Sequence, residues 1–303
     1  MTKNDITRGL IDFAVSQCLK NIKEDPYRSI RRLADLGRQF AKGRFQEELF
    51  SLFQRLLLNE DGPYYEMLKQ LVSSVDTDSL KTLGINIGYN SWTCGASRLR
   101  QITAEKDYPH WLAEISLSPE SSASQLKELL SAALKNGTYA FRLHMPAQSI
   151  TTDTRQLGLI REFPDCSFFL DFMDTDCTYS DDLLELTCSC DNLAFLVPFG
   201  SLQSRQLVDL LNARQRIYGV CRTYDNTNAA ERISDSQISE MLSWGSPLLF
   251  FLAAADTTQD NRLLVDNAIL DARLHQTYPA LLIHLDADVA RIQQLLLSSR
   301  KNL

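Results

Sequence analysis

Residues 110–130, HWLAEISLSPESSASQLKELL, decide the fold class of this chain. The apolar stretch Trp111–Leu117 predicts a buried strand, and Ser122–Lys135 predicts an amphipathic helix after a short turn. Ser121 or Ser122 would cap that helix with its hydroxyl oxygen. A strand that leads into a helix is the unit from which parallel sheets are built. We therefore expect an α/β domain.

The same alternation of short apolar runs and helical segments continues toward the C-terminus. Runs that are apolar at nearly every position fit parallel strands buried on both faces. Seven such units in a row, without a glycine-rich dinucleotide fingerprint, favour a full or partial (β/α) TIM-like barrel over a doubly wound sheet. The further predicted strands are Tyr139–Leu143, Ser167–Phe172, Leu193–Phe199, Ile217–Arg222, Leu248–Ala254 and Ala280–Leu285.

The first third of the chain shows helical periodicity only. Ile6, Leu10 and Phe13 recur at helical spacing, and Pro26 opens a second helix at a position where proline is favoured. We expect an α-helical N-terminal module over residues 1–105 and the barrel over residues 106–303. The second helix carries several arginines, which are most simply a solvated face, and a partner-binding surface is the alternative. These arginines are Arg28, Arg31, Arg32 and Arg38.

Composition limits the class of protein. Of the 303 residues, 44% are hydrophobic and 23% are charged, as in soluble globular proteins. Residues 1–110 hold 16 Lys/Arg and 14 Asp/Glu, whereas residues 111–303 hold 15 and 24, and such an acidic barrel argues against nucleic acid as a partner. The sequence shows no signal peptide and no run long enough to span a bilayer. The seven cysteines suggest reduced thiols. We therefore expect a cytoplasmic protein without a membrane partner.

Polar residues follow the predicted strands, at the end of a barrel where active sites lie. Arg142 and His144 alternate with apolar neighbours, so both should point to one face of the sheet. Asp171 begins an acidic stretch after the third strand, which is most simply a solvated loop. The full set of candidates for ligand binding is Arg142, His144, Asp171, Arg222, Asp225, His284 and Asp286.

The chain resembles the bacterial radical S-adenosylmethionine proteins that carry a helical extension before a partial barrel, both in the order of its segments and in the apolar character of its strands. The resemblance spans about residues 60–285. It rests on the helical stretch YYEMLKQLVSSVDTDSLKTLGINIGYNS, followed by HWLAEISL, LKNGTYAFRLHMP, LIREFPDCSFFLDF, IYGVCRTYDNTN and ISEMLSWGSPLLFFL.

This resemblance implies a site that the chain has lost. The family places C-x-x-x-C-x-x-C after the first strand, where three thiolates hold a [4Fe–4S] cluster that binds the methionine part of S-adenosylmethionine. Here that loop reads SPESSAS, without cysteine. The family's second-strand motif, which contacts the amino group of the cosubstrate, would fall at His144–Ala147, which reads HMPA. The positions that contact ribose and adenine would fall in LVPFG and AAADTT.

The resemblance therefore predicts a pseudoenzyme without cofactor. It would act as an accessory, regulatory or ligand-binding protein, with an intact paralogue or another protein as partner. One alternative is a metal-assisted barrel hydrolase or lyase that uses aspartates and histidines at the strand ends. Another is an interaction protein that binds through its N-terminal helices. The residues of the metal alternative would be His144, Asp171, Asp225, His284, Asp286 and Asp288.

Overall fold

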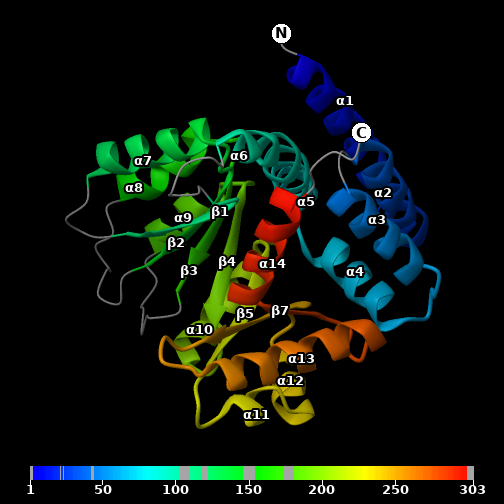
Figure 1. The fold of residues 1–303 in the computed structure, drawn as a ribbon, viewed down its shortest axis with the longest axis vertical. Coiled ribbons are helices and arrows are strands. Elements are labelled where there is room, and N and C mark those ends of the chain that lie inside the picture. Colours follow the sequence, from blue (N-terminus) through cyan, green and yellow to red (C-terminus); the bar gives the residue numbers. More distant parts are fainter. Residues whose placement is uncertain are drawn as a thin grey trace.

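A computed structural model describes residues 3–20, 22, 24–41, 44–102, 110–117, 122–145, 154–172 and 181–298. The chain begins with a helical module that lies to one side of the sheet (Figure 1). Proline opens two of its helices, and Asp25 and Asp76 cap two of them with their carboxylates. The module consists of α1 (Lys3–Leu19), α2 (Pro26–Phe40), α3 (Arg44–Leu56), α4 (Pro63–Ser74), α5 (Thr77–Ile85), the π-helix η1 (Asn86–Gly95) and α6 (Ala96–Ile102).

The rest of the chain builds one parallel sheet of seven strands in sequential order. Sequential order is the order of a barrel, but β1 and β7 form the two edges, so the sheet is a curled half-barrel (Figure 1). The prediction of a partial TIM-like barrel after N-terminal helices is thereby confirmed. The strands are β1 (Leu112–Ser116), β2 (Ala140–His144), β3 (Ser167–Asp171), β4 (Leu193–Pro198), β5 (Tyr218–Tyr224), β6 (Leu248–Ala253) and β7 (Leu281–His284).

Crossover helices cover the convex face of the sheet and form the main core with it. Phe168, Phe195 and Phe251 are fully buried in this layer. Ser122 and Gln125 form a capping box at the start of α7, which confirms the predicted serine cap. The helices after the strands are α7 (Ala123–Lys135), α8 (Thr154–Gly158) with the 3-10 turn η2 (Leu159–Glu162), α9 (Asp181–Cys188), α10 (Leu202–Ala213), α11 (Ala229–Arg232), α12 (Asp235–Leu242) and α13 (Gln259–His275).

The concave face of the sheet is covered by the C-terminal helix α14 (Leu285–Ser298), drawn in red in Figure 1. Leu285 packs with Leu196 and Phe250, while Leu296 packs with Leu112 of β1. This helix was not predicted from the sequence. The last predicted strand was expected to end at Leu285 in a polar loop, but β7 ends at His284 and the chain becomes helical directly after it.

The helical module is fixed to the amino ends of the strands. Asn86 donates a hydrogen bond of 3.0 Å to the carbonyl of Cys166, and the backbone N–H of Asp76 donates to the carbonyl of Gln215 at 2.8 Å. Val75 and Leu83 pack against strand residues of the inner face. The carboxyl ends of the strands, where barrel chemistry is located, face away from this contact. The predicted boundary at residues 105 and 106 lies outside the described residues.

Candidate functional site

Four charged side chains gather on the concave face at the carboxyl ends of β1, β2 and β3. Neighbouring residues of parallel strands point to the same face, and the register pairs Glu114 with Arg142 and His144 with Asp171. The prediction that Arg142 and His144 share one face is confirmed, and the structure brings Asp171 to both of them. We call Glu114, Arg142, His144 and Asp171 the mouth cluster.

The members of the mouth cluster are bonded to one another. Arg142 Nε donates to Asp171 Oδ2 at 2.7 Å, and Arg142 Nη1 donates to Glu114 Oε1 at 2.9 Å. The ring of His144 bridges both carboxylates, with Nδ1 at 3.2 Å from Asp171 Oδ2 and Nε2 at 3.5 Å from Glu114 Oε2. Two positive and two negative groups thus form a closed, electrically neutral arrangement.

Burial differs strongly within the mouth cluster. The side chain of Asp171 is 0% exposed and that of Arg142 is 7% exposed, whereas His144 is 26% and Glu114 is 51% exposed. A buried carboxylate and a buried guanidinium are tolerated when they compensate each other's charge. Asp171 and Arg142 therefore form the buried part of the mouth cluster, and Glu114 forms its solvent-exposed part.

These contacts shift the pKa values of His144 and Glu114. Hydrogen bonds to Asp171 and Glu114 raise the pKa of His144 to about 9. The hydrogen bond from His144, together with the charge of Arg142, lowers the pKa of Glu114 to about 2. At neutral pH the imidazole is therefore an imidazolium between two carboxylates. An imidazolium lacks the nitrogen lone pair that a metal ligand or a general base needs.

The raised pKa of His144 predicts a dependence of stability on pH. Since the pKa lies above its ordinary value of 6.5, the stabilisation is complete below pH 6.5 and is lost as the pH rises through about 9. We expect the free energy of unfolding, measured with urea, to fall over this interval, and the His144 ring to titrate near pH 9 in NMR spectra. His144→Gln should abolish most of the fall. A His144 midpoint near 6.5 would contradict the assignment.

Two other candidates lie away from the mouth cluster. Arg222 points to the convex side, where its guanidinium carbon lies 4.6 Å from the centre of the Phe199 ring. Asp225 accepts hydrogen bonds from the backbone N–H and the hydroxyl of Thr227 at 2.7 and 2.6 Å. These bonds are typical of a turn after a strand. Arg142, Arg222 and Asp225 therefore do not meet in one cavity.

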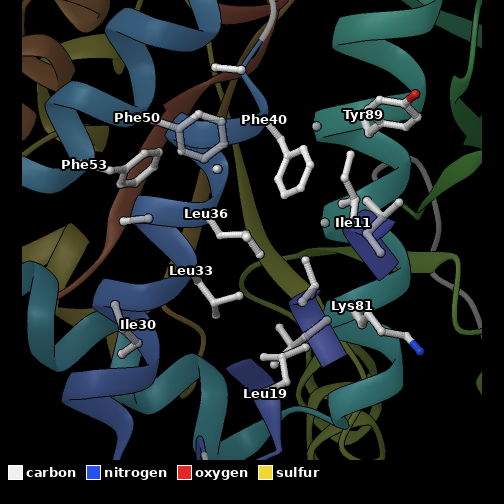
Figure 2. Close-up of a pocket in the computed structure, with 18 of the residues that line it drawn as sticks. Ile11, Leu19, Ile30, Leu33, Leu36, Phe40, Phe50, Phe53, Lys81 and Tyr89 are labelled. Atoms are coloured by element: carbon white, nitrogen blue, oxygen red, sulfur yellow. The ribbon is translucent and has the colours of Figure 1, made fainter. Parts of the chain in front are cut away.

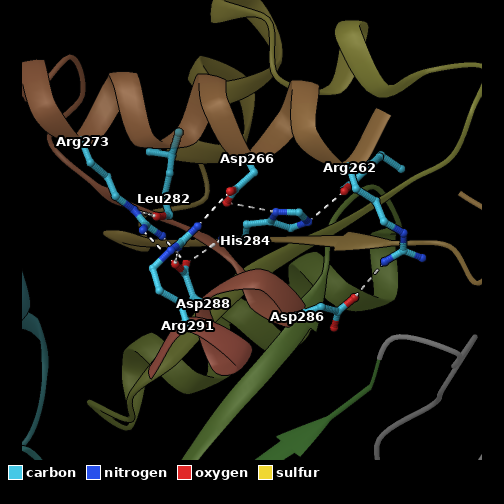
Figure 3. Close-up of polar contacts among 9 residues, drawn as sticks. Arg262, Asp266, Arg273, Leu282, His284, Asp286, Asp288 and Arg291 are labelled. Carbon is cyan, nitrogen blue, oxygen red and sulfur yellow. Dashed lines mark hydrogen bonds and ion pairs between the residues drawn. The ribbon is translucent and has the colours of Figure 1, made fainter. Parts of the chain in front are cut away.

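The remaining candidates belong to a polar network at the other edge of the sheet, shown in Figure 3. His284 is buried, with Nε2 at 2.8 Å from the hydroxyl of Tyr224 and Nδ1 at 3.4 Å from Asp266. Asp286 lies 3.6 Å from Arg262. Asp288 accepts a hydrogen bond of 3.0 Å from the backbone N–H of His284 and further bonds from Arg273 and Arg291. This network joins α13, β7 and α14.

Comparisons with known proteins find distant similarity among solved structures. No protein-family model matches the chain, and no curated protein matches it. Among solved structures, the crystal structure of SuiB from Streptococcus suis is similar, with a TM-score of 0.45 and 8% sequence identity. The match covers 80% of this chain and 55% of the SuiB chain, so this chain spans about half the length of that protein. Membership of the radical S-adenosylmethionine family stays a prediction.

Glu114 is not among the predicted site residues, because it lies in the stretch LAEIS, which was interpreted as an apolar strand. A usable signal was present, because Glu114 and Arg142 are opposite charges in the middle of consecutive predicted strands. Asp266 and Arg291 were not predicted either, although Asp266 lies beside His284 and forms an ion pair with Arg291. Their positions on helices gave no such signal.

The described residues contain no group of three or more His, Cys, Asp or Glu side chains that could hold a metal ion. The acidic stretch 173–180 and the first strand's loop at 118–121 lie outside these residues. Within the same ranges, no helix has the length and apolarity needed to cross a membrane. Arg28, Arg31, Arg32 and Arg38 of α2 are all exposed, which fits both the solvated face and the alternative of a partner-binding surface.

Proposed function

We propose that this chain is a radical-SAM-like half-barrel protein that has lost the site for the [4Fe–4S] cluster and acts without catalysis, as an accessory or regulatory protein. The observation that carries the proposal is the set of donors at the carboxyl end of β1. Residues 117–123 read LSPESSA, and an iron–sulfur cluster of this family needs three thiolates there. Serine hydroxyls do not replace thiolates as cluster ligands, so the residues present do not fit the cluster.

The described cysteines support the proposal by their positions. Cys188 and Cys190 flank the end of α9, before β4, at the amino edge of the sheet. Cys166 and Cys221 are buried, and burial raises the pKa of the Cys166 thiol to about 12 and that of Cys221 well above its ordinary value. A thiol with a raised pKa is a poor source of thiolate.

The residues at the end of β2 also support the proposal, because they are poorly suited to bind S-adenosylmethionine. By the resemblance, the residues from His144 onward would contact the amino group of S-adenosylmethionine. That group is an ammonium ion. The two carboxylates that could bind it, those of Glu114 and Asp171, already form ion pairs with the imidazolium of His144. A cosubstrate ammonium would have to displace the imidazolium from Glu114 or Asp171.

The metal-assisted alternative has less support, because its aspartates are neutralised by arginines. Asp288 pairs with Arg273 and Arg291, and Asp286 pairs with Arg262. For an accessory role the exposed arginine face of α2 is the surface that we favour for a protein partner, such as an intact paralogue.

Anaerobic reconstitution with iron and sulfide tests the proposed loss of the cluster. We expect well below four iron atoms per chain and no charge-transfer absorption of a four-iron cluster. The matched control is the double variant Cys188→Ser with Cys190→Ser, which removes the two thiols that are nearest to each other in the sequence. Any residual iron should fall in this variant. Four iron atoms per chain in both proteins, with a cluster spectrum, would overturn the proposal.

A further inference from the structure

The helical module contains a pocket of about 340 Å³ that is open to solvent on one side and is lined by residues of α1, α2, α3, α4, α5 and η1 (Figure 2). This volume is roughly twice that of an engineered cavity of about 150 Å³ that admits benzene. It also lies in the range of small-molecule pockets, which begins at about 300 Å³. Apolar side chains that line an open pocket are in contact with water unless a ligand covers them, and a pocket of this kind is the usual form of a small-molecule site.

The walls of the cavity are almost entirely apolar. Phe40 and Phe50 line it from α2 and α3, and Ile11 lines it from α1, as Figure 2 shows. Of the polar side chains in the wall, Gln46 donates hydrogen bonds to the hydroxyl of Thr93 at 2.6 Å and to the carbonyl of Gly88 at 3.1 Å. These groups satisfy one another, so the wall favours an occupant that brings no hydrogen-bonding groups of its own.

Two glycines hold the cavity open on the side of α5 and η1. Gly84 and Gly88 are one helical turn apart, and both line the cavity. A Cβ atom added to either residue would meet no atom within 4 Å. At Gly37, which also lines the cavity, an added Cβ would lie 2.1 Å from the ring of Phe50. Glycine is unfavourable inside a helix, and Gly84 and Gly88 gain no packing in return.

One side of the cavity has a polar rim. Lys81 precedes Gly84 by one turn, and its ammonium group lies 3.6 Å from Asp12 and 3.7 Å from Asp78. Gly84 itself is exposed to solvent. A ligand that enters here would keep its polar end in water beside Lys81 and place its apolar part inside.

We propose that this cavity binds the hydrocarbon chain of a fatty acid or another lipid. Such a chain gains free energy from burial of its apolar surface and needs no hydrogen-bond partner. An extended peptide is disfavoured, because its backbone N–H and C=O groups would be buried against apolar walls. This inference goes beyond the proposed function, since it concerns the helical module and does not depend on the state of the barrel.

Titration of the purified full-length protein with the fluorescent fatty acid cis-parinaric acid tests the proposal. We expect saturable binding of one probe per chain. Gly84→Leu should place a side chain in the cavity, weaken binding by at least about tenfold, and raise the melting temperature. Gly88→Leu should act in the same way and serves as the second variant. Far-UV circular dichroism checks that each variant is folded.

Gly9→Leu is the matched control. Gly9 lies in α1, is exposed, and has no atom within 4 Å of an added Cβ, but it does not line the cavity. Binding by this variant should equal that of the natural sequence. If lauric acid displaces the probe and dodecanol does not, the natural ligand carries a carboxylate, as a fatty acid does. If dodecanol displaces the probe equally well, the pocket recognises the hydrocarbon chain of the ligand and not its head group. Absence of saturable binding, or equal binding by the folded Gly84→Leu and Gly9→Leu variants, would overturn the proposal.

Discussion

Replacement of Asp171 by alanine is expected to lower the free energy of unfolding by about 3–5 kcal/mol. Asp171 is fully buried and accepts hydrogen bonds from Arg142, with His144 at 3.2 Å. Its removal leaves the 7%-exposed guanidinium of Arg142 without its main counter-charge, and an uncompensated buried charge is among the most costly defects in a protein. Urea denaturation followed by circular dichroism measures the effect.

Two further variants separate this explanation from a simple loss of packing. Glu114→Gln should cost less than about 1 kcal/mol, because Glu114 is half exposed and solvent screens its charge. Arg142→Met combined with Asp171→Leu should recover most of the stability, because both charges are removed together. If the double variant were as unstable as Asp171→Ala, the charge balance would not be the cause.

Replacement of Asp288 by alanine is expected to lower the free energy of unfolding by about 2–4 kcal/mol. The Asp288 carboxylate accepts bonds from Arg273 of α13, from Arg291 of α14 and from the backbone N–H of His284. Loss of these bonds should loosen α14 from the inner face of the sheet. Urea denaturation gives the stability, and hydrogen exchange should show faster exchange of α14 amides.

Asp286→Ala is the natural control for Asp288→Ala. Asp286 lies two residues earlier in the same helix turn, is 47% exposed, and has one ion pair of 3.6 Å with Arg262. An exposed pair of this kind contributes less than about 1 kcal/mol. Equal destabilisation by the two variants would show that the network around Asp288 has no special role.

The sheet could be predicted from the sequence, because strands buried on both faces produce apolar runs of the right length. The direction of Arg142 and His144 followed from strand alternation. Their carboxylate partners could not be assigned, because Glu114 and Asp171 are 28 and 29 residues from Arg142 and meet it only through the strand register. The mouth cluster is therefore a property of the sheet, and no single segment encodes it.

The position of α14, the direction of His284 and the pocket in the helical module depend on tertiary packing, which sequence periodicity does not predict. The pattern of α14 is amphipathic, but nothing local states that this helix packs on the concave face of the sheet. His284 ends a strand and points to the convex side, which separates it from His144 although both follow apolar runs. The pocket lies between helices that are far apart in the sequence, and the two glycines that line it, Gly84 and Gly88, carry no sequence signal of a binding site.

Formation of 5′-deoxyadenosine from S-adenosylmethionine is the most direct test of the proposal that this half-barrel does not support radical chemistry. The measurement uses reconstituted protein under strictly anaerobic conditions with dithionite, and liquid chromatography quantifies the product. We predict no 5′-deoxyadenosine above the amount formed without protein. Formation of at least one equivalent of 5′-deoxyadenosine per chain would contradict the account.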